Sequence, residues 1–261
     1  MHVLHFSRKQ EGQTLSSLFL SLLLSLNIFA GEANNQNLKN SNITKPVSSS
    51  MTKMEKKVRL AAVKVHYGSG HGSGSLIKYK GSHFVITANH VIANERPYFG
   101  KEFLIKGYNQ TKTGVLVHSD PQFDIAVLYL DKSQHFYNNE PMKWKPMASM
   151  PTVGQQITYS GYPSWHSLMT FRGSVAGFET FSDVGPQIIL NVFGWFGSSG
   201  SVVYTEKGEI MGVLWAVDME HNPTMQVNED MVWVSPIMNL NIQRVLNEIC
   251  KHAAFPIKGC D

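Results

Sequence analysis

Three short segments of the chain carry the side chains that acyl transfer at a serine needs. Residues 197–201 read G-S-S-G-S, in which Ser199 offers a hydroxyl beside two glycines. His90 lies within T-A-N-H-V-I, and Asp124 opens the apolar run D-I-A-V-L-Y-L. The reaction requires a nucleophile, a base that takes its proton, a group that holds the base, and donors for the developing oxyanion. The sequence contains a candidate for each.

Each segment also has a plainer interpretation. A loop rich in glycine and serine is often a flexible turn, and an aspartate directly before a strand is often a turn residue or a cap. The glycines of the 197–201 segment nevertheless let the backbone bend sharply, so that the N–H groups of Gly197 and Ser199 can face one oxygen. Apolar neighbours at Ala88 and Val91 predict that His90 is half buried, which suits a base whose pKa stays near neutrality.

The elements that must position these residues are mostly short strands. Frequent Gly, Pro, Asn and Asp residues interrupt alternating or apolar runs, which is typical of an all-β barrel or sandwich. We expect strands at 58–67, 72–79, 83–88, 112–118, 124–130, 155–160, 169–178, 187–193, 201–205, 209–217 and 231–235. Three prolines between residues 132 and 153 divide them into two sets. A helical stripe of apolar residues predicts one helix at 237–253.

The N-terminal region has the pattern of an export signal. Basic residues precede a Leu/Ser-rich apolar run at 15–29, and small residues follow it. We therefore expect a signal peptide at 1–30, a periplasmic or secreted protein, and no stable membrane insertion after cleavage; an uncleaved membrane anchor is the alternative. Residues 31–57, rich in Asn, Gln, Ser and Lys, predict a disordered linker. In an oxidising compartment Cys250 and Cys260 could pair, or either could be free.

Composition argues against several other classes of function. A net charge of +4 without a basic run interleaved with aromatic residues argues against nucleic-acid binding. The chain has 11 histidines but no H-E-x-x-H or comparable ligand spacing. We therefore considered a metal-dependent hydrolase and set it aside, and we expect neither a metal nor another cofactor.

The combination of motifs resembles the chymotrypsin-fold serine proteases, and more closely their HtrA (Deg) branch without a PDZ domain. The order His90, Asp124, Ser199 is that of chymotrypsin-type enzymes. The resemblance also rests on G-S-G-S-L-I (72–77), G-Y-P (161–163), G-S-V-A-G-F (173–178) and G-E-I-M-G-V (208–213).

This resemblance implies two six-stranded antiparallel β-barrels. The two strand sets place them at 58–145 and 146–236, and the helix predicted from periodicity lies in a C-terminal segment, helix and tail, at 237–261. It implies an endopeptidase that acts on polypeptides through an acyl-enzyme. His90 would be the general base, Asp124 its orienting partner and Ser199 the nucleophile. The N–H groups of Gly197 and Ser199 would form the oxyanion hole. The oligomeric state stays open.

Two departures from the family pattern concern the nucleophile loop. The family usually has a second glycine where this chain has Ser201, and trypsin-like zymogens have an aspartate where it has Ser198. Without that carboxylate a new N-terminus has no buried partner, so we expect no trypsin-style zymogen activation. An intact set of His, Asp and Ser favours an enzyme, but a catalytically inactive, protease-like binding module is the alternative function.

The expected substrate pocket contains no acidic side chain. The resemblance places Phe193 at its floor and Trp215, Ala216 and Val217 along its wall. We therefore expect cleavage after apolar or small residues rather than after Arg or Lys. Phe193 could equally pack in the core.

Overall fold

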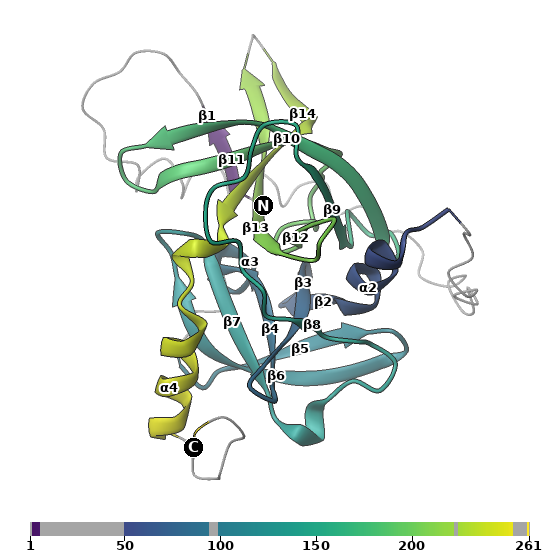
Figure 1. The fold of residues 1–261 in the computed structure, drawn as a ribbon, viewed down its shortest axis with the longest axis vertical. Coiled ribbons are helices and arrows are strands. Elements are labelled where there is room, and N and C mark those ends of the chain that lie inside the picture. Colours follow the sequence, from purple (N-terminus) through teal and green to yellow (C-terminus); the bar gives the residue numbers. More distant parts are fainter. Residues whose placement is uncertain (1, 6–49, 94–98, 222–223, 253–259, 261) are drawn as a thin grey trace. The chain divides into compact units, whose positions relative to one another are not determined.

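The computed structural model describes residues 2–5, 50–93, 99–221, 224–252 and 260. Most of the expected signal peptide (1–30) and most of the expected linker (31–57) lie outside these residues. In the described part of the chain, no helix is both long enough and apolar enough to cross a bilayer. The strands form two sheets, and each sheet closes on itself as a barrel of six antiparallel strands (Figure 1).

The first barrel, drawn in blue to teal in Figure 1, has the strand order β2-β5-β6-β7-β4-β3 and is closed by pairing of β2 with β3. Its strands are β2 (Ala62–Tyr67), β3 (Gly70–Tyr79), β4 (Ser82–Ala88), β5 (Glu102–Gly107), β6 (Gln110–Asp120) and β7 (Ile125–Leu130). A short seventh strand, β8 (Met142–Lys143), pairs in parallel with β3.

The second barrel has the strand order β12-β9-β10-β11-β14-β13 and is closed by pairing of β13 with β12. Its strands are β9 (Gln156–Gly161), β10 (Met169–Phe181), β11 (Gly185–Asn191), β12 (Val202–Thr205), β13 (Ile210–His221) and β14 (Met225–Pro236). Strand β1 (His2–His5) pairs in parallel with residues 216–219 of β13, as an additional strand of this sheet. The expected pair of six-stranded antiparallel barrels is confirmed.

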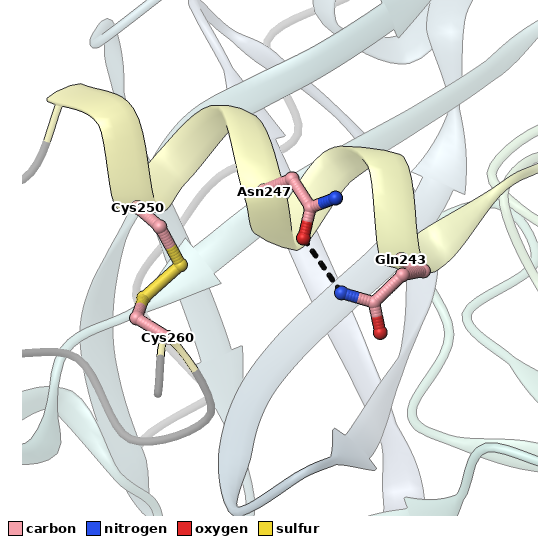
Figure 2. Close-up of a disulfide and its surroundings, with 4 residues drawn as sticks. All are labelled: Gln243, Asn247, Cys250 and Cys260. Carbon is pink, nitrogen blue, oxygen red and sulfur yellow. Dashed lines mark hydrogen bonds between the residues drawn. A yellow bond between two sulfur atoms is a disulfide. The ribbon is translucent and has the colours of Figure 1, made fainter.

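The helices are short and lie outside the barrels. Among the described residues they are α2 (Lys53–Ala61), α3 (Asn89–Ala93) and α4 (Ile242–His252), with 3₁₀ turns η2 (Lys132–Gln134) and η3 (Ile237–Asn239). The helix predicted at 237–253 is therefore a 3₁₀ turn followed by α4. A disulfide joins Cys250 at the end of α4 to Cys260 (Figure 2), which settles the pairing that the sequence left open. On the same helix, Gln243 Nε2 donates to Asn247 Oδ1 over 2.7 Å.

The prediction that a strand begins at residue 58, directly after a disordered linker, is wrong. Residues 53–61 form α2 instead, and the strand begins at Ala62. Thr52 and Glu55 form a capping box, in which Thr52 Oγ1 accepts from the Glu55 N–H and the Glu55 carboxylate accepts from the Thr52 N–H. The buried side chains of Val58 and Ala61 join the core that fills the first barrel. Capping and burial together stabilise a helix where the apolar run alone suggested a strand.

Strand β5 was not predicted. Its burial alternates strictly, with Phe103 and Ile105 inside and charged or exposed residues between them. The other predicted strands of both barrels correspond to strands of the structure, with shifted ends.

Candidate active site

The register of β4 and β7 brings His90 and Asp124 together. These strands are antiparallel neighbours in which Ala88 lies opposite Ile125. The chain that leaves β4 therefore faces the residue that precedes β7. The backbone confirms this contact, because the Asn89 N–H donates to the Asp124 carbonyl oxygen over 3.0 Å.

Both carboxylate oxygens of Asp124 bind His90. The Nδ1 atom of His90 lies 2.6 Å from Asp124 Oδ2, and the His90 backbone N–H donates to Asp124 Oδ1 over 2.7 Å. A ring whose Nδ1–H donates to a carboxylate keeps Nε2 as its proton acceptor. The pair thus fixes the orientation of the imidazole and the tautomer that a general base requires.

This pair is shielded from water. Asp124 is 6% exposed, and burial lowers the pKa of the His90 imidazole well below its ordinary value. The contact with the Asp124 carboxylate acts in the opposite direction, since a negative charge favours the imidazolium. The neutral ring, which is the form that can accept a proton, is therefore favoured at rest.

Ser199 lies in a tight loop between β11 and β12. Gly197 and Gly200 flank it with φ values of +92° and +89°, in the left-handed region that favours glycine. A Cβ atom at position 200 would lie 2.1 Å from the Ser73 oxygen and 2.9 Å from the Ala88 nitrogen. Gly200 thus lets the loop at 197–201, which carries the candidate nucleophile, approach the end of β4, two residues before His90.

Two backbone N–H groups of this loop do not donate to a backbone oxygen of the described residues. Within the described ranges, the backbone N–H groups of Ser198, Gly200 and Ser201 donate to backbone oxygens, whereas those of Gly197 and Ser199 do not. In a trans peptide the C=O and N–H groups point in opposite directions. The oxygens of the same two peptides accept from the Ser164 and Ser201 N–H groups. Both remaining N–H groups are therefore held on the other side of their peptides, available to an oxyanion.

The three candidate catalytic residues differ in the contacts that they make. His90 and Asp124 are in direct contact, whereas Ser199 is 1% exposed and its Oγ makes no hydrogen bond within the part of the chain that the structure describes. The loop at 197–201 approaches the end of β4 through Gly200, whereas the Ser199 hydroxyl makes no hydrogen bond to His90.

The expected pocket residues divide between surface and core. Phe193 is 39% exposed and stacks on Phe171 with ring centroids 5.3 Å apart, so it does not pack in the core. Trp215 donates from Nε1 to Gln187 Oε1 over 3.0 Å. Ala216 and Val217 are fully buried.

Sequence reasoning missed the residues that hold the nucleophile loop from outside. They are Ser73 and His71 on β3 and the segment from Tyr162 to Ser164, all of which contact the loop or one another. The motif G-S-G-S-L-I contains Ser73, but nothing local reveals a partner 124 residues away. In the described ranges, no group of three or more His, Cys, Asp or Glu side chains is arranged to hold a metal ion.

Comparison with known proteins identifies the family. The sequence profile of the trypsin-like peptidase domain matches residues 72–213, a stretch that includes His90, Asp124 and Ser199. The chain belongs to the trypsin-like peptidase family. No curated protein matches it significantly in sequence.

Solved structures of low identity share the fold of this trypsin-like peptidase. An inactive serine-to-alanine mutant of Rv3671c from M. tuberculosis H37Rv is 16% identical with a TM-score of 0.56, over 81% of this chain and 98% of that one. A serine endoprotease from Yersinia pestis is 19% identical with a TM-score of 0.58, over 77% and 68%. The HtrA-type protease AlgW, solved with a tripeptide, is 18% identical with a TM-score of 0.59, over 76% and 63%. The fold and family are thus those of serine proteases.

Proposed function

We propose that the protein is a serine endopeptidase that hydrolyses peptide bonds through His90, Asp124 and Ser199. The observation that carries this proposal is the two-point contact between His90 and the buried Asp124 carboxylate, at the strand end against which the Ser199 loop packs. Family membership alone does not separate an active enzyme from an inactive relative. A histidine held in the tautomer of a general base is specific support for activity.

In acylation, Ser199 Oγ attacks the carbonyl carbon of the scissile peptide bond while His90 Nε2 takes the hydroxyl proton. The carbonyl oxygen becomes negative and accepts hydrogen bonds from the N–H groups of Gly197 and Ser199. The intermediate then collapses, the C–N bond breaks, and the imidazolium gives its proton to the departing amine. An ester between Ser199 and the acyl part of the substrate remains.

In deacylation, a water molecule repeats the sequence. His90 takes a proton from the water as its oxygen attacks the ester carbon, and the same two N–H groups bind the oxyanion. Collapse breaks the bond to Ser199 Oγ, which regains a proton from the imidazolium. The acid product leaves, and Asp124 has stabilised the imidazolium in both halves without being protonated itself.

We further propose that cleavage follows apolar or small residues and that the enzyme acts after export. None of Phe193, Trp215, Ala216 and Val217 carries a negative charge that could form an ion pair with a basic side chain, and Phe193 offers a partly exposed apolar ring. Profiling cleavage sites in a peptide library tests the preference, and a dominant preference for Arg or Lys contradicts it. Fractionation of cells that express the chain tests export.

A second candidate function, an inactive protease-like binding module, is favoured by the state of the nucleophile. The Ser199 hydroxyl is buried and makes no hydrogen bond within the described part of the chain. An enzyme must open this environment to its substrate, whereas a binding module need not.

A fluorophosphonate probe, which phosphonylates activated serines, separates the two candidates. Ser198 provides the matched control, because it is the adjacent serine and is fully buried as well. We expect labelling of the full chain and of Ser198→Ala but not of Ser199→Ala, whose kcat should fall about 10⁶-fold. Labelling that persists in Ser199→Ala, or never occurs in the wild type, contradicts the endopeptidase proposal.

A further inference from the structure

Ser73 connects the first barrel to the nucleophile loop of the second. It lies on β3, is fully buried, and follows Gly72, whose missing side chain lets the Ser199 oxygen approach. A Cβ atom at position 72 would lie 3.0 Å from that oxygen and 2.4 Å from the Val91 side chain. The backbone of β3 thus passes directly beneath the loop that carries the nucleophile.

Ser73 uses its side chain and its backbone on the same loop. Its Oγ donates to the Gly197 carbonyl oxygen over 2.7 Å and accepts from the Tyr162 N–H over 2.9 Å. Its own N–H donates to the Ser199 carbonyl oxygen over 2.7 Å. Its carbonyl oxygen in turn accepts from Thr87 Oγ1 over 2.7 Å. Every hydrogen-bonding group of this buried residue has a partner, so its position is strongly determined.

These contacts restrain the peptides next to the two oxyanion donors. The Gly197 carbonyl belongs to the peptide after the Gly197 N–H, and the Ser199 carbonyl to the peptide after the Ser199 N–H. Gly197 has no side chain to restrict its rotation, and the peptide between Gly197 and Ser198 is held at its nitrogen, where the Ser198 N–H donates to the Trp195 carbonyl oxygen over 2.9 Å. The Ser73 hydroxyl holds that peptide by its oxygen.

The Tyr162 segment strengthens this arrangement from the other side. The Tyr162 carbonyl lies 3.1 Å from His71 Nε2, and the Ser164 N–H donates to the Phe196 carbonyl. That carbonyl shares its peptide with the Gly197 N–H. The Ser73 hydroxyl therefore links the two segments that set the directions of the oxyanion donors.

We propose that Ser73 is a positioning residue that holds the Gly197 and Ser199 N–H groups in register for the oxyanion. The proposal rests on the proposed endopeptidase function and names a determinant of it. Ser73 does not touch the substrate, and it acts through the Gly197 peptide. Its loss should therefore weaken stabilisation of the transition state more than binding of the substrate.

The test compares Ser73→Ala with Ser75→Ala in the full chain. Ser75 is a matched control because it lies on the same strand, is 3% exposed, and has a side chain hydrogen-bonded to the Tyr204 hydroxyl instead of to the loop. For an ester substrate we expect Ser73→Ala to lower kcat by about 10- to 100-fold with little change in KM. Ser75→Ala should lose similar thermal stability and keep its kcat.

A second readout reports the oxyanion directly. A ¹³C-labelled peptide aldehyde adds to the serine hydroxyl as a hemiacetal, and the NMR shift of its carbon follows ionisation of the hemiacetal oxygen. Ser73→Ala should raise the pKa of that oxygen relative to the wild type, because misplaced donors stabilise the anion less. Ser75→Ala should not.

The outcomes separate this inference from the function on which it rests. A wild type that does not react with the fluorophosphonate probe overturns both. A reactive wild type with an equally active Ser73→Ala variant, or equal losses in the Ser75→Ala variant, overturns the inference alone. If Ser73→Ala does not fold, Ser73→Cys keeps the side-chain shape with a much weaker donor and carries the same expectations.

Discussion

Asp124 has a backbone conformation that few aspartates adopt, with φ of +52°. Asparagine and aspartate tolerate this left-handed region better than other residues with side chains. The conformation lets the Asp124 carbonyl accept from the Asn89 N–H while both carboxylate oxygens bind His90. One residue thus anchors the backbone and the ring of the base together.

The variant Asp124→Asn should show how much activity depends on the charge of the Asp124 side chain rather than on its shape. Asparagine has the same size and accepts the same backbone angle, so the fold should persist. Its NH₂ group cannot accept from the imidazole, which should leave His90 in the wrong tautomer and lower kcat about 10⁴-fold. Steady-state kinetics with an ester substrate measures the loss. Asp120→Asn, at the turn before Asp124, is the control, and a rate within about tenfold of wild type in Asp124→Asn contradicts the assigned role.

At the scale of elements, α2 holds the two barrels together. It packs against β3 and β8 of the first barrel and against β9 and β10 of the second. Glu55 in its first turn forms a two-point ion pair with Arg172 of β10, through Arg172 Nε and Nη2. These contacts provide the buried Glu55 carboxylate with a charged partner.

The variant Glu55→Gln should lose this connection. We expect a loss of about 1–2 kcal/mol in the free energy of unfolding at neutral pH, at the lower end for a charged hydrogen bond because Arg172 is 59% exposed. The exposed pair between Glu248 and Lys251 provides a control, and Glu248→Gln should change little. Urea unfolding followed by circular dichroism measures both.

The Glu55 pair should also depend on pH in a defined direction. The hydrogen bond from Arg172 lowers the pKa of Glu55 from 4.5 to about 2. Because the folded pKa is depressed, the stabilisation is fully present above about pH 4.5 and is lost as the pH falls towards 2. The difference between wild type and Glu55→Gln should therefore be constant above that range and shrink below it. A difference that grows on acidification contradicts the ion pair.

Sequence patterns predicted most elements because burial in a barrel follows a period of two residues. They failed at α2, where the run V-R-L-A-A-V-K-V fits a strand as well as a helix, although T-K-M-E at 52–55 already had the form of a capping box. The pairing partner of Glu55, 117 residues away on β10, is set by tertiary contacts. No local pattern could supply it.

The candidate site shows the same division. His90, Asp124 and Ser199 could be named as candidates because their side-chain chemistry and chain order are specific. The residues that hold the 197–201 loop could not be predicted, because Ser73 has a sequence neighbourhood that differs little from that of Ser75. Only the packing of β3 against the nucleophile loop distinguishes the two serines.

At the scale of the whole trypsin-like domain, one hydrophobic core contains side chains from both barrels. The cluster that fills the first barrel also contains Val202, Tyr204 and Val213 of the second barrel and the apolar face of α4. Within this shared core, the Tyr204 hydroxyl lies 2.8 Å from Ser75 Oγ, across the boundary between barrels. Burial raises the pKa of Tyr204 above its ordinary value, so its hydroxyl stays protonated and able to donate.

This buried bond predicts coupling between the barrels. Tyr204→Phe leaves Ser75 Oγ unsatisfied, and Ser75→Ala leaves the tyrosine hydroxyl unsatisfied, so each should destabilise the protein by about 1–3 kcal/mol. The double variant removes both groups and should cost less than the sum of the single changes. Urea unfolding should show one transition by circular dichroism and by tryptophan fluorescence, because the core of the first barrel includes side chains of the second. Additive losses would argue against the bond, and two separate transitions would show that the barrels fold independently.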